Sequence, residues 1–213
     1  MQMQSKQYHK IETLFERSET TKKLIGGKFR NPAIEYLQNN QWQFTEKVDG
    51  TNVRIFWDGH SVSFHGRTDN AQMPVKLTNR LNELFGGEVN AQMFEQKFGE
   101  TPVLLVGEGY GAGIQKGGAY RDDQTFILFD VMINDLWLER KNVEDIAEYF
   151  CIGIVPIVMT GTIQEAVDYV KTAPNSLIGT AKSEGLVGRP LVEMYDRRGK
   201  RIIVKIKVED FER

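Results

Sequence analysis

The chain has 213 residues, of which 40% are hydrophobic and 26% are charged, the ordinary balance of a globular protein. Its formal net charge of -2 excludes a surface coated in positive potential, so any polyanion must be held by a local basic cluster. The single cysteine, Cys151, excludes an internal disulfide and a cysteine-based zinc site.

The start of the chain, residues 1–10, is polar and lacks the apolar core of a signal peptide, and no later run reaches transmembrane length. These features predict a cytoplasmic protein without a membrane segment, located in the host cytoplasm if its source is viral. Next in the chain, Ile11, Leu14 and Phe15 have helical spacing and predict a short helix. Residues 26–31 are rich in Gly, Lys and Asn and predict a loop.

Alternating apolar residues predict strands over residues 42–47, 53–57 and 62–64, and Asp-Gly pairs after the first two are hairpin signals. Leucine and aromatic residues at helical spacing then predict helices over residues 77–85 and 93–98. This part of the chain is therefore predicted to be a set of hairpins followed by two helices.

The second half is predicted to contain buried strands, two helices and a last hairpin. The runs that predict strands are residues 103–106, 126–129, 185–188, 191–195 and 201–207, with a turn at Arg197-Arg198-Gly199. Residues 142–150 and 162–170 predict helices, the second of them opened by a capping box. Hairpins mixed with helices predict an α+β fold with largely antiparallel sheets. No linker divides the chain, so we expect one domain over residues 1–213.

The segment Glu46-Lys47-Val48-Asp49-Gly50-Thr51-Asn52 is the most informative part of the chain. It places a lysine at the end of an alternating apolar run and before a Val-Asp-Gly turn, where an amine can be partly desolvated and become a nucleophile. The alternative is a hairpin with Asp-Gly at its turn and a solvated lysine at the strand end. The motifs that follow favour the nucleophile.

Six motifs occur in a fixed order along the chain. They are Lys47-Val48-Asp49-Gly50, Gly66-Arg67-Thr68, Gly107-Glu108-Gly109-Tyr110-Gly111, Phe129-Asp130-Val131, Glu184-Gly185-Leu186-Val187 and Val204-Lys205-Ile206-Lys207. This order resembles the covalent nucleotidyltransferases, which include ATP-dependent ligases and mRNA capping enzymes. Within them, the first and third motifs are similar to the phage RNA ligases that seal nicked double-stranded RNA. The resemblance covers residues 44–207. It implies an adenylyltransferase domain of two mainly antiparallel sheets with flanking helices, ATP-grasp-like and without an OB-fold.

The resemblance also implies a role for each motif residue. Lys47 is the implied catalytic residue, which carries AMP through a phosphoramidate bond. The implied nucleotide-binding residues are Glu46, Asn52, Arg67, Glu108, Phe129, Glu184, Lys205 and Lys207. Among these, Glu46 is expected to meet the adenine amino group and Phe129 to stack on the purine. Arg67 and Glu108 are expected at the ribose and phosphates, and Asn52 at the reacting phosphates or the acceptor end.

Several of these residues have a simpler alternative. Arg67 after a hairpin is more often a surface arginine, and Phe129 in an apolar run is more often core. Lys205 and Lys207 share one face of a strand, because side chains two apart point the same way. The two ammonium groups can both contact one phosphate, or the two lysines can simply form a strand face exposed to water. Glu108 and Glu184 lie beside apolar strands, where a carboxylate is costly unless it is paired or contacts a ligand.

The expected substrate is ATP, and a triphosphate brings Mg²⁺ or Mn²⁺ with it. Such an ion binds through one or two carboxylates, waters and phosphates, so Glu184 is the candidate metal residue, directly or through water. The candidate RNA-binding cluster lies near the C-terminus and consists of Arg197, Arg198, Lys200 and Arg201.

The predicted function is an ATP-dependent RNA ligase that joins 3′-hydroxyl and 5′-phosphate ends through lysyl-AMP and an adenylylated RNA 5′ end. Two alternatives remain open: a nucleotide- or RNA-binding module that depends on a partner, and a minimal DNA ligase. Only six residues follow Lys207, whereas many such ligases continue into a further domain. We therefore expect that a protein partner can supply that domain.

Overall fold

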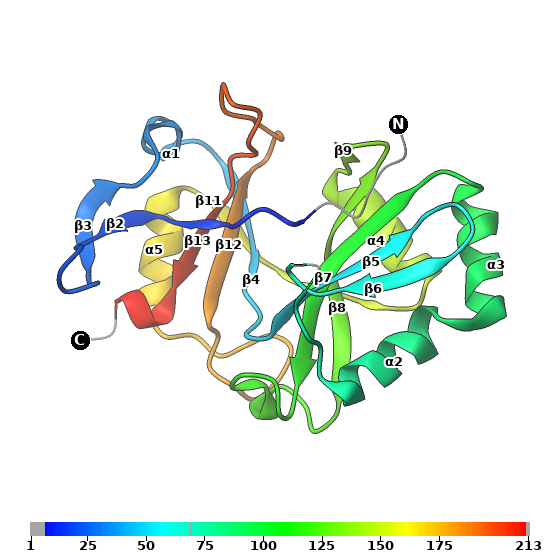
Figure 1. Cartoon of the computed structure of the whole chain (residues 1–213). Helices are drawn as coiled ribbons and strands as arrows, with labels where there is room; N and C mark the ends of the chain where they lie inside the picture. Colours follow the sequence, from blue (N-terminus) through cyan, green and yellow to red (C-terminus); the bar gives the residue numbers. More distant parts are fainter. Residues whose placement is uncertain (1–6, 69, 212–213) are drawn as a thin grey trace. The chain divides into compact units, whose positions relative to one another are not determined.

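The computed structural model describes residues 7–68 and 70–211, so part of the polar start, residues 1–6, lies outside the described chain. The described residues form two compact units, each with its own hydrophobic core. The six-stranded unit holds residues 7–9 and 49–155, and the five-stranded unit holds residues 10–48 and 156–211. In both units helices flank mainly antiparallel strands, which confirms the predicted α+β class (Figure 1). Every helix among the described residues is too short or too polar to cross a membrane.

The sheet of the six-stranded unit has the strand order β10-β8-β7-β5-β6, and β9 pairs with β8. Its strands are β5 (Thr51–Trp57), β6 (Val62–His65), β7 (Val103–Gly111), β8 (Gln124–Ile133), β9 (Leu136–Trp137) and β10 (Gly153–Ile154). The β10–β8 pair is parallel and the other pairs are antiparallel. The helices of this unit are α2 (Val75–Phe85), α3 (Gly87–Phe98) and α4 (Arg140–Tyr149), with a 3-10 turn at Gly117–Ala119.

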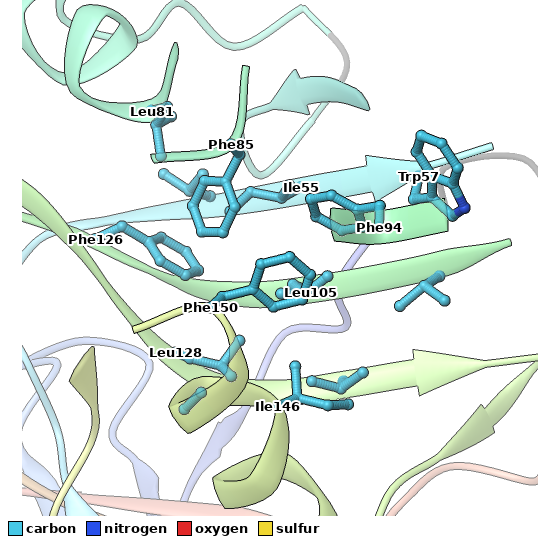
Figure 2. Packing of buried hydrophobic residues seen from close by; sticks show 14 of the residues in the cluster. Ile55, Trp57, Leu81, Phe85, Phe94, Leu105, Phe126, Leu128, Ile146 and Phe150 are labelled. Carbon is cyan, nitrogen blue, oxygen red and sulfur yellow. The ribbon is translucent and has the colours of Figure 1, made fainter. Parts of the chain in front are cut away.

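One face of this sheet packs against the helices and forms a core rich in phenylalanine. Because side chains alternate along a strand, Val53, Ile55 and Trp57 of β5 all point to that face. Aromatic rings from the helices fill the space above them, and the rings of Phe94 and Phe150 lie 4.5 Å apart (Figure 2). Burying each such side chain contributes about 1.5 to 3 kcal/mol. This packed face holds the sheet rigid, and its strands present their other residues on the opposite face.

The sheet of the five-stranded unit has the strand order β1-β13-β12-β4-β11. Its strands are β1 (Glu12–Thr13), β4 (Trp42–Glu46), β11 (Ile157–Gly161), β12 (Gly185–Pro190) and β13 (Val204–Lys207). The β1–β13 pair is parallel, and the other pairs are antiparallel. The unit also contains α1 (Pro32–Tyr36), α5 (Ile163–Lys171), a 3-10 turn at Val208–Asp210, and a separate ribbon of β2 (Phe15–Arg17) and β3 (Leu24–Phe29). Trp42, Phe44 and Val204 are fully buried in its core.

Local predictions failed in four places. The hairpin predicted at Asp49-Gly50 does not form, because β4 and β5 belong to different sheets. The helix predicted at Ile11, Leu14 and Phe15 is wrong, because this stretch pairs as β1 and β2 instead of turning on itself. The loop predicted at residues 26–31 is largely part of β3, an exposed strand in which Gly26 meets no neighbouring side chain. Residues 191–195 form no strand, and the predicted last hairpin is closed instead by the β12–β13 pair, with an isolated bridge between Tyr195 and Arg201. In each case strand pairing, and not the local spacing of apolar residues, decides the outcome.

Candidate active site

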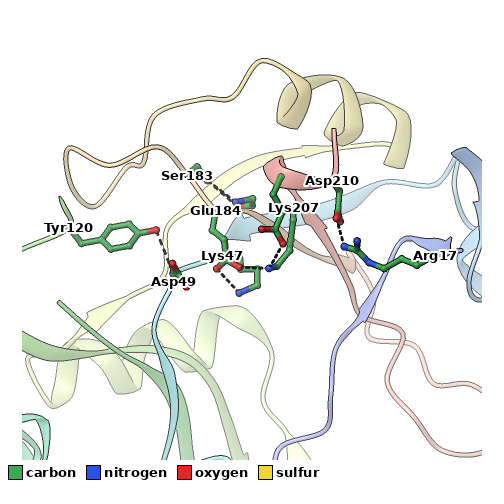
Figure 3. A network of polar contacts seen from close by, with 10 residues as sticks. Arg17, Lys47, Asp49, Tyr120, Ser183, Glu184, Lys207 and Asp210 are labelled. Atoms are coloured by element: carbon green, nitrogen blue, oxygen red, sulfur yellow. Dashed lines mark hydrogen bonds and ion pairs between the residues drawn. The ribbon is translucent and has the colours of Figure 1, made fainter. Parts of the chain in front are cut away.

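Lys47 follows the last residue of β4, and its backbone fixes it there. Its N–H donates to the carbonyl of Gly185 at 2.9 Å, and the next residue, Val48, is buried. The side chain then meets Glu184, whose Oε2 lies 2.7 Å from Lys47 Nζ (Figure 3). The side chains are only 22% and 16% exposed, so this is a charge-assisted hydrogen bond in a partly desolvated setting. The lysine is held in one direction by a carboxylate.

Glu184 also binds a second lysine. Its Oε1 lies 3.0 Å from Lys207 Nζ, which in turn lies 2.8 Å from Glu209. Burial alone would lower the pKa of Lys207, but the hydrogen bonds to Glu209 and Glu184 outweigh it and raise that pKa. The contact depends on strand pairing, because Gly185 lies opposite Lys207 in the β12–β13 ladder. A Cβ added to Gly185, which has a φ of +146°, would stand 2.0 Å from the carbonyl oxygen of Ile206. Only glycine lets the two backbones approach so closely.

Lys205 lies on the same face of β13 as Lys207 but in a different electrostatic environment. The structure gives it no carboxylate within ion-pair distance among the described residues. Burial lowers the pKa of Lys205, and the positive charges of Lys47 and Lys207 lower it further. Protonated, it is therefore a partly buried cation that forms no ion pair within the described parts of the chain, although the charge of Glu184 attracts it from farther away. Such a group is already placed to meet an anion such as a phosphate.

Glu46 points away from this lysine cluster and into the protein. It is 2% exposed, and its two oxygens accept hydrogen bonds from the Ser176 hydroxyl and from the Leu177 N–H, the latter at 2.8 Å. The Ser176 hydroxyl oxygen also accepts from the N–H of Ile178 at 3.0 Å. A buried carboxylate with two donors is satisfied. Glu46 therefore anchors the start of the segment 174–183, and Lys47 holds Glu184, the residue just after its end.

In the six-stranded unit, Asn52 and Glu108 lie directly opposite each other on β5 and β7. The Gly-Glu-Gly order sets this arrangement. A Cβ on Gly107 or Gly109 would run into the core side chains of Phe126 or Leu77, at 2.4 Å in each case, so both glycines face the core and Glu108 faces away. Asn52 Oδ1 is buried and has no hydrogen-bond partner among the described residues. A buried acceptor without a partner is unusual and indicates a place for a ligand or water.

Phe129 and Arg67 occupy other parts of the same unit. Phe129 lies at an irregularity in the β7–β8 ladder, half-buried, with its ring 5.3 Å from the ring of Tyr8 in an edge contact. The Tyr8 hydroxyl donates to Asp130 at 2.9 Å. Arg67 is exposed in the turn after β6, and this turn is held by Arg54, a fully buried side chain that donates to the carbonyl of Gly66 at 2.8 Å.

The basic cluster near the C-terminus divides into two kinds of residue. Arg197, Arg198 and Lys200 are exposed in the loop between β12 and β13. Arg201, by contrast, has a side chain only 2% exposed and is paired with Glu193 through two of its nitrogens. Its role in this structure is to fix the base of the loop, and this part of the sequence prediction does not match the geometry.

A family model described as RNA ligase matches residues 40–207 of the chain. The chain belongs to the RNA ligase family. The match begins just before β4 and ends at Lys207, so it includes motif residues from both units. A comparison with curated proteins gives no match.

Solved RNA ligases from Naegleria gruberi have a similar fold. A mutant with ATP and manganese is 17% identical, with a TM-score of 0.64 over 84% of this chain and 54% of that one. The ligase with pyrophosphate is 21% identical, with a TM-score of 0.62 over 83% and 52%. A mutant without ligand is 16% identical, with a TM-score of 0.66 over 96% and 60%. The chain therefore has the nucleotidyltransferase fold of RNA ligases and spans a little over half the length of these relatives.

Sequence reasoning about this RNA ligase gave no role to four residues that bond to the motif segments, although one of them, Asp130, lies within the motif Phe129-Asp130-Val131. They are Tyr8, Arg54, Asp130 and Ser176. Two of them carried a signal, because Arg54 and Asp130 are charged residues in apolar strands, where a charge must be paired or used. Ser176 lies in an irregular segment, and Tyr8 near the start of the chain, so nothing in the sequence around them marks a partner.

No group of three or more His, Cys, Asp or Glu side chains forms a metal site among residues 7–68 and 70–211. Glu184 is the carboxylate nearest the predicted nucleophile, and both of its oxygens face lysines. Because both oxygens are already bonded to ammonium groups, Glu184 fits a divalent ion that it reaches through water and whose shell is completed by phosphate oxygens. It does not fit an ion held by protein groups alone.

Proposed function

We propose that this chain is an ATP-dependent RNA ligase that works through a covalent enzyme-AMP intermediate on Lys47. The single observation that carries the proposal is the ion pair of Lys47 with Glu184 at 2.7 Å, with Lys205 and Lys207 close by, in a chain of the RNA ligase family. An amine of fixed direction beside a proton acceptor and two further cations is what nucleophilic attack on a phosphate requires. One family model spans both units, which supports their action as a single adenylyltransferase domain.

In the first step the Lys47 ammonium gives one proton to the Glu184 carboxylate, its hydrogen-bond partner, and the free amine then attacks the α-phosphorus of ATP. A phosphorus–nitrogen bond forms, the bond from that phosphorus to the bridging oxygen breaks, and pyrophosphate leaves with the electron pair. The second proton, which the nitrogen loses as the phosphoramidate forms, passes to solvent. Lys205, which lacks a carboxylate partner, meets the charge that grows on the phosphate oxygens. An attack of this kind needs positioning and charge compensation more than covalent chemistry by other residues.

Two further transfers complete the proposed reaction. An oxygen of an RNA 5′-phosphate attacks the lysyl-AMP phosphorus, AMP moves to the RNA, and the Lys47 amine is released. A 3′-hydroxyl then attacks the RNA 5′-phosphorus, forms the phosphodiester bond and expels AMP, while its proton passes to solvent. Both transfers reuse the cations that the first step requires. In this proposal the enzyme acts in the cytoplasm on RNA that carries 3′-hydroxyl and 5′-phosphate ends.

The other motif residues take the roles that the family resemblance implies. Glu46 meets the adenine amino group through lone pairs that remain after its bonds to Ser176 and Leu177. Asn52 and Glu108, which share one face of the sheet, bind the ribose and phosphate region, and the unpartnered Asn52 Oδ1 supports this placement. Phe129 stacks on the purine, and Arg67 contacts a phosphate.

A divalent cation belongs to this proposal as the companion of the triphosphate. Glu184 is the residue that would hold it through a water molecule, because its own oxygens are bonded to Lys47 and Lys207, and phosphate oxygens would complete the shell. When bound, Mg²⁺ or Mn²⁺ would neutralise charge on the phosphates. The Naegleria gruberi ligases with ATP or AMP and manganese support this choice.

The test is the intact mass of the protein after incubation with ATP and Mg²⁺. We expect a gain of one AMP in the natural chain and none in Lys47→Ala. Lys47→Arg is the matched control, since it keeps a cation beside Glu184 but removes the transferable amine. Folded protein that binds ATP but gains no mass would contradict the proposal and favour the alternative of a binding module that depends on a partner.

Substrate tests then separate the remaining alternatives. Joining of nicked RNA without joining of nicked DNA supports the RNA ligase, and joining of nicked DNA alone favours a minimal DNA ligase. AMP loading without joining of either would indicate that a partner supplies a further domain.

A further inference from the structure

The loop between β12 and β13 presents an aromatic ring and three cations beyond the ends of these two strands of the five-stranded sheet. Tyr195 is 50% exposed, and Arg197, Arg198 and Lys200 are exposed beside it in sequence. The loop, drawn in orange to red, projects past the ends of these two strands (Figure 1). An exposed tyrosine next to several cations is the composition of a single-strand binding platform, where the ring stacks on a base and the cations follow the backbone.

The loop is held in one conformation by bonds within itself. Asp196 donates its N–H to the Lys200 carbonyl at 2.8 Å, and its side chain accepts from the N–H groups of Arg198 and Lys200 at 2.8 and 2.9 Å. Gly199, with a φ of +74°, completes the turn. The carboxylate of Asp196 is thus occupied by its own backbone, and these bonds lower its pKa. A rigid turn costs less entropy when it binds a ligand.

The base of the loop is fixed separately. Arg201 lies opposite Tyr195 in an isolated bridge, and its buried guanidinium is paired with Glu193. This arginine therefore serves the loop itself and is not available to a ligand. The exposed Tyr195 and the three exposed cations stand on this anchored base.

Strand pairing sets how far the loop lies from the lysine cluster. Arg201 precedes Lys205 by four residues and Lys207 by six in a largely extended segment. At about 3.3 Å per residue the loop base lies roughly 13 to 20 Å from these lysines. At the rise of a stacked strand, about 3.4 Å per nucleotide, this corresponds to about four to six nucleotides.

We propose that this loop binds unpaired RNA about five nucleotides from the phosphate that is joined, with one base stacked on Tyr195. The inference rests on the proposed function for the identity of the ligand and deepens it by naming the part of the RNA that is held. RNA is the occupant that fits, because three exposed cations complement a phosphate backbone and an exposed tyrosine complements an unpaired base. A fully paired duplex keeps its bases stacked and offers the ring no partner.

The test is the dissociation constant for fluorescent single-stranded RNA of sixteen nucleotides, measured by anisotropy. We expect Tyr195→Ala to raise it about ten-fold, within the range of one base–aromatic stack. The combined variant Arg197→Ala, Arg198→Ala and Lys200→Ala should reduce the slope of log affinity against log salt by about two, because each lost phosphate contact removes about 0.7. Tyr36→Ala is the matched control, since Tyr36 is 86% exposed in α1. Lys22→Ala with Lys23→Ala is the matched control for charge in an exposed turn.

Length and pairing of the RNA give the decisive comparison. A four-nucleotide strand and a fully paired duplex should bind Tyr195→Ala as well as the natural chain. The proposal would be overturned if Tyr195→Ala lost the same affinity for the sixteen-nucleotide strand, the four-nucleotide strand and the duplex. It would also be overturned if the variant lost affinity for none of them. Unchanged RNA affinity together with lost binding of a protein partner would assign the loop to that partner instead. Intact-mass AMP loading is measured in parallel, and it should be unchanged in Tyr195→Ala, so failure of the proposed function and failure of this inference can be told apart.

Discussion

Lys47 and Glu184 are 137 residues apart in the chain, yet their side chains form a hydrogen bond of 2.7 Å. The bond joins the residue that follows β4 to the residue that precedes β12, two strands paired side by side in one sheet. The same sheet places Lys207 on the other oxygen of Glu184. Strand register therefore places the predicted nucleophile beside its carboxylate.

We predict that Glu184→Ala lowers both stability and AMP loading. Removing this carboxylate leaves two partly buried lysines without their shared partner, which should cost about 2 kcal/mol of unfolding free energy. AMP loading should fall at least ten-fold, because the amine loses its fixed direction and its proton acceptor. Urea denaturation and intact mass measure the two effects. Glu209→Ala is the control, since Glu209 is the other partner of Lys207 but is 61% exposed, and it should change neither by much. Equal effects of the two variants would contradict this assignment.

Ser176 is predicted to act through Glu46. Ser176→Ala removes the hydroxyl that donates to this buried carboxylate, a loss of about 1.5 to 3 kcal/mol for a hydrogen bond to a charged group. We expect a lower melting temperature and about ten-fold slower AMP loading, with Ser176→Thr restoring most of both. Leu177→Ala is the control, because Leu177 contributes its backbone N–H and its side chain is 58% exposed. If Ser176→Ala melts lower but loads AMP at the natural rate, Ser176 has a structural role only.

Elements with a strong local signal could be predicted from the sequence. Residues 77–85 and 162–170 have a single helical stripe, and the predicted capping box at Thr162 is present in α5. The α+β class and the antiparallel sheets followed from hairpin turns between alternating strands. The lysine motif was found because its charge interrupts an apolar pattern, and the structure gives that lysine a carboxylate partner.

Features that depend on distant pairing could not be predicted in this way. The N-terminal segment at Ile11 forms strands because β13 and β3 supply partners, and a helical spacing of three residues carries no information about them. The strand predicted over residues 103–106 continues to Gly111, because β5 and β8 pair with both sides of that segment. The burial of Arg201 likewise depends on Glu193, eight residues away across a loop.

Lys205 and Lys207 are predicted to affect stability in opposite directions although they share one strand face. The pKa of Lys205 is lowered on folding, so below its ordinary value the unfolded chain binds more protons and the charged lysine destabilises the fold. Lys205→Met should therefore raise the melting temperature at pH 7, by up to about 2 °C. This gain should shrink as the pH rises toward 10.5, the ordinary pKa, because the folded Lys205 then loses its proton first.

Lys207→Met is the matched comparison, and its expected change in melting temperature at pH 7 has the opposite sign. The pKa of Lys207 is raised on folding, so its stabilising contribution is complete at neutral pH and is lost as the pH rises above 10.5 through its folded pKa. Lys207→Met should lower the melting temperature at pH 7. Both variants should load AMP more slowly, since each removes a cation near Lys47. A fall in melting temperature for Lys205→Met at pH 7 would contradict the electrostatic account of this pair.

The two glycines that flank Glu108 are predicted to differ in how far they tolerate a methyl group. A Cβ at Gly107 would lie 2.2 Å from the backbone carbonyl oxygen of Ile127, whereas a Cβ at Gly109 meets first the side chain of Leu77 at 2.4 Å. A backbone atom in a paired strand cannot move away, but a leucine can change rotamer at a cost. Gly107→Ala should therefore lose more than about 3 kcal/mol of unfolding free energy, and Gly109→Ala about 1 to 3 kcal/mol.

Gly26→Ala in β3 completes this series, because a Cβ there meets nothing within 4 Å and its φ is not positive. We expect its unfolding free energy to stay within about 0.5 kcal/mol of the natural value. Urea denaturation of the three variants gives the order directly. If Gly109→Ala proved as neutral as Gly26→Ala, the helix α2 would not pack on β7 as closely as the structure has it. Glu108 would then lack the rigid backing that directs it to the opposite face of the sheet.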